Sequence, residues 1–268
     1  MVSRTSRCRR FGCVRHTSPG WLVAFFLSVL VGGALCLYVL YAYAWDPKQE
    51  FCMTVAWDTL RACTGGGAAP LPTDKLDRTG KPILSWRRIG LSIDPGARLG
   101  DPNAPWNAPA NYPMAMTGFP TFCFMNPPGI ICELFPSYYP QTRVLAITGP
   151  DTAFDPDREI SLKYLPPNLI LLVEVWGTGI NWLQPEDIDV RDYRLLRMDG
   201  RHGRGCWVLF ADGILAFVRS DVPLENVKRF CTITSAKKSN REELLGPFIV
   251  RAVDLSRGAA EAQRPLNP

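Results

Sequence analysis

The stretch of sequence that decides the fold is CWVLFADGILAFV, residues 206–218. It holds two apolar runs, 206–210 and 214–218, and the segment between them ends in Asp212-Gly213. An Asp-Gly pair tolerates the positive φ angles of a tight turn. The stretch therefore predicts a β-hairpin, which is a pair of antiparallel strands joined by a short turn.

Regular structure is also indicated on both sides of this hairpin. Residues 143–148 (RVLAIT) and 169–176 (LILLVEVW) have the composition of strands, and the second is apolar on both faces, as a central strand is. After the hairpin, Asp221 and then Ser239 or Asn240 mark the starts of two short helices. Together these elements predict an α+β fold with an antiparallel sheet.

A proline-rich segment precedes these strands. Residues 94–141 contain ten of the 24 prolines in the chain. Proline removes a backbone donor and breaks helices, so this density excludes a long helix here. We expect an irregular insertion that is held in place by its aromatic side chains.

The N-terminal region contains a long run without charge, from Trp21 to Ala44. A bilayer core is crossed by roughly 20 apolar residues in a helix, so the run predicts a transmembrane helix. Five arginines precede it: Arg4, Arg7, Arg9, Arg10 and Arg15. Because such clusters stay in the cytoplasm, we expect a single-pass protein of a bacterial cell membrane, with its C-terminal domain outside the cytoplasm.

The end of this run also resembles a signal-peptide cleavage site, because Ala42 and Ala44 flank Tyr43. The apolar run exceeds the roughly 7–15 residues of a usual signal peptide, which favours a retained signal-anchor. Both outcomes place the rest of the chain outside the cytoplasm. The predicted organisation is a basic tail (1–20), a transmembrane helix (21–44), a short stalk and linker (45–79), a domain (80–255) and a flexible tail (256–268).

The net charge of +5 comes from this N-terminal tail. Without its five arginines, 25 basic residues remain, and they equal the 25 acidic residues in number. A neutral domain offers no positive surface for a phosphate backbone. The composition therefore argues against nucleic acid as a partner.

Six cysteines follow the apolar run, and in an oxidising compartment an even number permits disulfides. They are Cys52, Cys63, Cys123, Cys132, Cys206 and Cys231. Proximity in sequence favours the pairs Cys52–Cys63 and Cys123–Cys132. The alternative is that they are small buried thiols. A zinc site is disfavoured because the chain has no Cys-x-x-Cys pair.

Five segments, taken in order, resemble a large bacterial pilin-like family known as domain of unknown function 1559, which carries a His-x9-Asp-Gly motif. That motif matches HGRGCWVLFADG, from His202 to Gly213. The other four segments are GKPILSWR (80–87), DPNAPWNAPAN (101–111), TRVLAITGPDTAF (142–154) and LILLVEVWGTGINWLQPEDI (169–188).

The resemblance implies an N-terminal helix followed by a pilin-like domain on the cell envelope, with no established activity. Family members usually begin with a prepilin signal that contains a glutamate inside the apolar helix. The helix of this chain begins at Gly20-Trp21 and has no glutamate. Prepilin processing and assembly into a filament are therefore not expected.

Two charged side chains invite a catalytic interpretation. His202 could act as a base with Asp212, but a hairpin strand of about 17 Å separates the two, so a structural role is favoured. Glu174 lies inside an apolar strand, where an unpaired charge is costly. We expect it to pair with Arg87, and its alternative use is as a general acid.

Two acidic groups and a set of aromatic residues have alternative interpretations. Asp151, Asp155 and Asp157, or Glu186, Asp187 and Asp189, could supply oxygens to calcium, but neither group has the EF-hand pattern. Trp176, Trp182 and Trp207 with Glu186 could form a carbohydrate platform. Solvated loops and core packing are the simpler readings, so no metal and no cofactor are predicted.

These observations favour a membrane-anchored, non-enzymatic envelope protein that presents its domain for structural or interaction roles. The expected partners are the lipid bilayer and other envelope proteins, and no small-molecule substrate is identified. The alternative is an anchored hydrolase or glycan-binding protein that uses Glu174, His202 or Glu186. An enzyme should gather at least two of these groups in one cavity.

Overall fold

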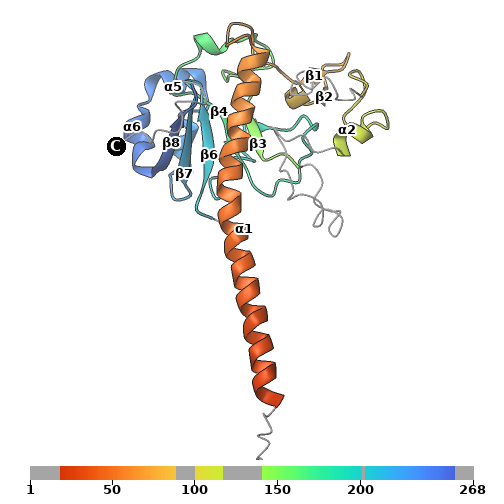
Figure 1. The fold of residues 1–268 in the computed structure, drawn as a ribbon. Helices are drawn as coiled ribbons and strands as arrows, with labels where there is room; N and C mark the ends of the chain where they lie inside the picture. The colour runs from red at the N-terminus through yellow and green to blue at the C-terminus, as the bar shows by residue number, and fades with distance from the viewer. Residues whose placement is uncertain (1–18, 89–99, 117–140, 201–202, 257–268) are drawn as a thin grey trace, which may run out of the picture. The chain divides into compact units, whose positions relative to one another are not determined.

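The structure is a computed structural model, and it describes residues 19–88, 100–116, 141–200 and 203–256. The chain divides into two compact units, 1–47 and 48–268. The second unit contains every strand and all the helices after the first (Figure 1). Sequence reasoning placed residues 45–79 in a stalk ahead of the domain, whereas the compact unit begins at Lys48.

The elements are mostly short, apart from the first helix. The helices are α1 (Pro19–Cys63), α2 (Tyr112–Met116), α4 (Leu224–Lys228), α5 (Ile233–Lys238) and α6 (Arg241–Leu244), with 3₁₀ turns η2 (Leu162–Tyr164) and η3 (Gly246–Phe248). The strands are β1 (Lys75–Leu76), β2 (Pro82–Leu84), β3 (Val144–Thr148), β4 (Ile170–Glu174), β5 (Ile188–Asp189), β6 (Gly205–Phe210), β7 (Ile214–Arg219) and β8 (Ile249–Asp254).

The main sheet has six strands in the order β5-β3-β4-β6-β7-β8, and β1 and β2 form a separate ribbon. The hairpin predicted at residues 206–218 is present as β6 and β7, with Trp207 opposite Phe217. Strands β3, β4, β6, β7 and β8 pair antiparallel. Strand β5, however, runs parallel to β3. The sheet is therefore mixed, and the predicted antiparallel sheet is corrected at this edge.

The predicted transmembrane helix is also wrong. Within the described stretches of the chain, no helix combines the length and the apolar character that a bilayer crossing requires. The predictions of a signal-anchor, of a single-pass topology and of a membrane localisation depended on this helix and are corrected with it.

One face of the sheet is covered by the end of α1. Met53, Ala56, Trp57 and Leu60 are buried there in one cluster with sheet residues. Those sheet residues include Val144, Leu172, Trp207, Leu209 and Leu215. The spacing of the four α1 residues places them on one side of the helix, as an amphipathic packing helix requires.

The other face of the sheet packs against the short C-terminal helices. Leu145, Val173 and Val208 are buried there with Val227 of α4 and Phe230 just after it. Because both faces are covered, all five residues of β4 are buried. Its first four residues are apolar, as this central position requires.

The turn between β6 and β7 contacts the C-terminal part of α1 and the residues that follow β8. Gly213 has φ +85°, and a Cβ there would lie 2.8 Å from Cζ2 of Trp57. The carbonyl of Gly213 also accepts a hydrogen bond from the Leu255 amide at 3.0 Å. The glycine of the motif is thus the place where α1 and the end of β8 approach the hairpin.

The described part of the proline-rich insertion, residues 100–116, consists of turns and α2. Asn111 organises it, because its side-chain amide donates to the carbonyls of Asp101, Ala104 and Pro105 at 2.9–3.0 Å. The remainder of the predicted insertion lies outside the described residues.

Candidate functional site

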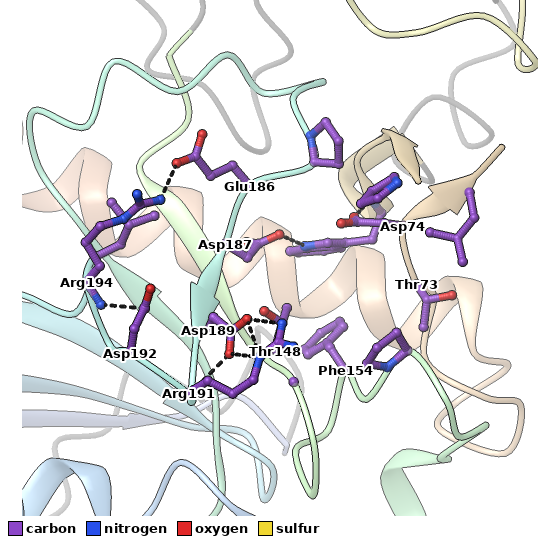
Figure 2. Close-up of a pocket in the computed structure, with 17 residues that line it drawn as sticks. Thr73, Asp74, Thr148, Phe154, Glu186, Asp187, Asp189, Arg191, Asp192 and Arg194 are labelled. Atoms are coloured by element: carbon purple, nitrogen blue, oxygen red, sulfur yellow. Dashed lines mark hydrogen bonds and ion pairs between the residues drawn. The ribbon is translucent and has the colours of Figure 1, made fainter. Parts of the chain in front are cut away.

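A cavity of about 330 Å³ lies beside Trp86, between the β1–β2 ribbon and the β5 edge of the sheet. Its walls combine aromatic and proline side chains with charged ones, as Figure 2 shows. The lining residues that carry the argument are Asp74, Trp86, Phe154, Glu186, Asp187 and Asp192. A cavity of this size with a few convergent polar groups is the usual form of a binding site.

A buried ion pair lies next to the cavity, and one of its members, Asp187, belongs to the cavity lining. Arg87 and Asp187 are paired, and their side chains are 0% and 2% exposed. The guanidinium also donates to the carbonyl of Val144 at 3.0 Å and to the hydroxyl of Ser85 at 2.6 Å. Asp187 in turn accepts the backbone N–H of Ala146 on β3 at 2.7 Å. The pair therefore joins the end of β2 to the edge of the main sheet.

Trp86 connects this ion pair to a second carboxyl group. Its indole Nε1 donates to Asp187 at 3.0 Å, and its backbone N–H donates to Asp74 at 2.8 Å. The ring packs against Phe154, with 5.2 Å between the ring centroids. One tryptophan thus fixes two acids and one aromatic wall of the cavity.

The rim of the cavity carries two exposed ion pairs. Arg191 pairs with Asp189, and Arg194 pairs with Glu186 at 3.2 Å. The guanidinium of Arg191 holds the pKa of Asp189 below its usual value. Gly149 lets this rim approach β3, because a Cβ there would meet Asp189 and Val190 at 3.1 Å.

The two inner acids have raised pKa values. The pKa of Asp187 is raised to about 7, and burial is the largest cause. The charge of Asp74 also raises this pKa, whereas Arg87 lowers it. Burial also raises the pKa of Asp74, against the lowering effects of the Trp86 amide and of Arg87. Because only one guanidinium serves two carboxyls, the pair takes up a proton near neutral pH.

This pair predicts that the protein loses stability as the pH rises from about 4 to about 8. The pKa is raised in the folded state, so the folded protein holds a proton there that the unfolded chain has lost. Asp74→Asn removes one of the two competing charges and should flatten this loss. We expect the variant to match the wild type at pH 4 and to melt roughly 2–4 °C higher at pH 8.

Thermal melts followed by circular dichroism at both pH values test this expectation. Asp221→Asn is the control, because Asp221 belongs to an exposed ion pair with Arg219. An unchanged slope in Asp74→Asn would show that the pair does not titrate in this range.

The predicted partner of Arg87 is corrected by these contacts. Arg87 pairs with Asp187 rather than with Glu174. Glu174, on β4, is buried and accepts the backbone N–H of Trp207 at 3.2 Å. The sequence showed that a buried charge needed a partner, but it could not show which acid the fold brings to Arg87.

Asp212 and Gly213 of the His-x9-Asp-Gly motif lie in the turn of the β6–β7 hairpin. Asp212 accepts the amide of Ile214 at 3.0 Å and pairs with Arg241 at 2.9 Å. Gly213 supplies the turn conformation. His202 lies outside the described residues. The structure therefore assigns Asp212 and Gly213 to turn formation, and it brings neither to the cavity.

The acidic groups considered for calcium have other partners. Asp155 accepts the backbone amides of Asp151 and Asp157 at 3.1 and 3.0 Å. Asp151 accepts the amide of Thr234 at 2.9 Å. Among the residues that the structure describes, no three His, Cys, Asp or Glu side chains gather as a metal site would require.

The aromatic platform predicted from three tryptophans is not assembled. Trp182 and Trp207 are core residues with 1% and 4% exposure. Neither they nor Trp176 line the cavity, although Glu186 does. The aromatic walls are Trp86 and Phe154 instead.

Four of the six cysteines considered for disulfides are described. Cys52 and Cys63 both lie on α1, where 11 residues at ~1.5 Å each separate them by about 16 Å, too far for a mutual disulfide. Cys206 and Cys231 are buried thiols, and burial raises the pKa of Cys231 to about 12. Cys123 and Cys132 lie outside the described residues.

Sequence reasoning missed Asp74, Trp86 and Phe154 as members of one site. Trp86 lies two residues after Leu84, the last residue of β2, and Asp187 directly precedes Ile188, the first residue of β5. No periodicity marks either position. The hydrogen bond from the Trp86 indole to Asp187 joins residues that are 101 positions apart in the chain.

Comparison with protein-family models, with curated proteins and with solved structures gives no match.

Proposed function

We propose that the protein is a non-enzymatic structural or interaction protein, and that it recognises its partner through the cavity beside Trp86. One observation supports this most. The acids around the cavity are held by the fold, with Asp187 fixed by Arg87 and Asp189 by Arg191. Groups held in this way keep a binding surface rigid.

The pilin-like resemblance is part of this proposal. It is supported by the five segments in order and by an N-terminal helix whose end packs on a mostly antiparallel sheet. Fold resemblance does not define a function, so the binding role is argued from the cavity alone.

A hydrolase or glycan-binding protein is the second candidate. The observation in its favour is that Trp86, Phe154 and Glu186 line one cavity, as aromatic and acidic groups do in sugar sites. Glu174, the other acid considered for catalysis, is buried in β4 and does not line the cavity. The glycan-binding form of this candidate is therefore the stronger one.

Calorimetric titration of the full chain at neutral pH tests the proposal. The probes are Nα-acetyl-lysine methylamide, Nα-acetyl-glutamate methylamide and chitotriose. Thr73→Trp fills the cavity mouth, and Thr234→Trp places the same ring on exposed α5 as a control. We expect at least one probe to bind the wild type and the control alike, and to bind Thr73→Trp about tenfold more weakly, a change of ~1.4 kcal/mol.

Two results would contradict the proposal. One is that no probe binds the wild type. The other is that mass spectrometry finds chitotriose cleaved by the wild type and intact with Thr73→Trp, which would support the hydrolase.

A further inference from the structure

Negative charge is in excess around the cavity. Its lining carries five carboxyl groups, those of Asp74, Glu186, Asp187, Asp189 and Asp192, and two guanidinium groups, those of Arg191 and Arg194. Arg87 adds a third positive group behind Asp187. Three positive groups against five negative ones leave a formal excess of two negative charges at this site.

Asp74 and Asp192 carry that excess. Asp74 accepts the Trp86 amide through Oδ1, and Asp192 accepts the Arg194 amide through Oδ1 at 2.9 Å. Within the described part of the chain, neither carboxyl forms an ion pair. Asp74 is half-buried and lies within the cavity, whereas Asp192 is exposed at its rim.

The walls between these two acids suit an apolar stem. Trp86 and Phe154 belong to the cavity lining and are 2% and 3% exposed. Leu76 and three prolines, Pro82, Pro156 and Pro185, complete the apolar lining. Long basic side chains bury their methylene stems on such surfaces while their charged ends reach polar groups.

We propose that this cavity binds the side chain of a lysine or arginine presented by a partner protein. The ammonium or guanidinium group meets the carboxyl group of Asp74, and the stem lies along Trp86 and Phe154. The inference rests on the proposed function and adds the chemistry of the ligand to it.

Titrations of the full chain with matched probes test the chemistry. Nα-acetyl-lysine methylamide and Nα-acetyl-arginine methylamide carry the cation, and Nα-acetyl-norleucine methylamide is the neutral isostere of lysine. We expect the two cationic probes to bind at least about tenfold more tightly than the norleucine probe, as a charge-assisted hydrogen bond of ~1.5–3 kcal/mol implies.

Charge-neutral variants locate the contact. Asp74→Asn keeps an acceptor for the Trp86 amide, and Asp192→Asn keeps one for the Arg194 amide. Asp74→Asn should weaken the lysine probe about tenfold, and Asp192→Asn, at the exposed rim, should weaken it less. Both should leave the norleucine probe unchanged. Glu243→Gln removes an exposed carboxyl on α6, away from the cavity lining, and should leave both probes unchanged.

The outcomes separate this inference from the function on which it rests. Binding of chitotriose or of the glutamate probe, without binding of either cation, overturns the cationic ligand and leaves a binding cavity. If Glu243→Gln weakens binding of the lysine probe as much as Asp74→Asn does, the contact with Asp74 is overturned and a general effect of net charge is indicated. Spermidine binding as tight as that of the lysine probe, with the same loss in Asp74→Asn, replaces the partner protein with a free polyamine. Failure of every probe overturns both proposals.

Discussion

Replacing Gly213 by alanine should lower the free energy of unfolding by about 3–4 kcal/mol. A side chain at φ +85° costs ~1–2 kcal/mol by itself. The new Cβ would also lie 2.8 Å from Cζ2 of Trp57 and 3.2 Å from the Ser256 amide, so α1 or the hairpin must move. Denaturant unfolding of the full chain measures the loss.

Gly80→Ala is the matched control for this change. Gly80 has nearly the same backbone angle, φ +83°, and no atom lies within 4 Å of its ideal Cβ position. It should therefore report the backbone cost alone, about 1–2 kcal/mol. In a Trp57→Leu background, Gly213→Ala should cost less than in the wild type, because the indole that it strikes is gone and only the Ser256 amide at 3.2 Å remains close. Equal losses for Gly80→Ala and Gly213→Ala in the wild-type background would show that Trp57 does not pack on this turn.

Replacing Arg87 by methionine should be equally damaging, with a loss of about 3–5 kcal/mol. The methionine leaves the carboxylate of Asp187 buried without its ion-pair partner. It also leaves the carbonyls of Val144 and Glu186 without the donors that Arg87 supplies. We expect the contact of β5 with β3 to weaken first, since Asp187 accepts the Ala146 amide at that edge in addition to the backbone pairing.

Two comparisons separate the buried charge from general loss of packing. Arg191→Met removes the cation of an ion pair in which the arginine side chain is 73% exposed, and it should cost under about 1 kcal/mol. The double variant Arg87→Met with Asp187→Asn should recover part of the loss, because no buried charge then remains unpaired. A double variant less stable than Arg87→Met alone would contradict this explanation.

The hairpin was predictable from sequence because its determinants are local. Asp212-Gly213 and the flanking apolar runs specify the turn without reference to the rest of the chain. The apolar character of β4 likewise predicted a central strand, and all five of its residues are buried. These elements depend on neighbours in sequence, which a single sequence displays directly.

The mixed sheet and the site were not predictable in this way. Strand β5 has only two residues, Ile188 and Asp189, so no periodicity marks it. Trp86 contacts Asp74, 12 residues before it, and Asp187, 101 residues after it, and no local pattern in the sequence indicates these contacts. The same limit explains why Arg87 was assigned to Glu174, since both candidates are acids near apolar strands.

The run from Trp21 to Ala44 shows a different limit. The sequence shows a long uncharged run preceded by five arginines, and these features predict a bilayer crossing. The described residues contain no helix that meets the requirement for length and apolar character. Residues 45–79 were predicted to be a short stalk and linker, whereas Met53, Ala56, Trp57 and Leu60 are buried in the core of the domain.

The account depends most on the cavity beside Trp86 being a binding site. The indole N–H of Trp86 reports on it directly, because it donates to Asp187 and its ring lines the cavity. In ¹H–¹⁵N spectra of the full chain titrated with the lysine probe, the Trp86 indole signal should move in proportion to occupancy. The signal of Trp182, which does not line the cavity, should stay in place. A Trp86 signal that stays fixed at saturating concentrations of every probe would contradict the account.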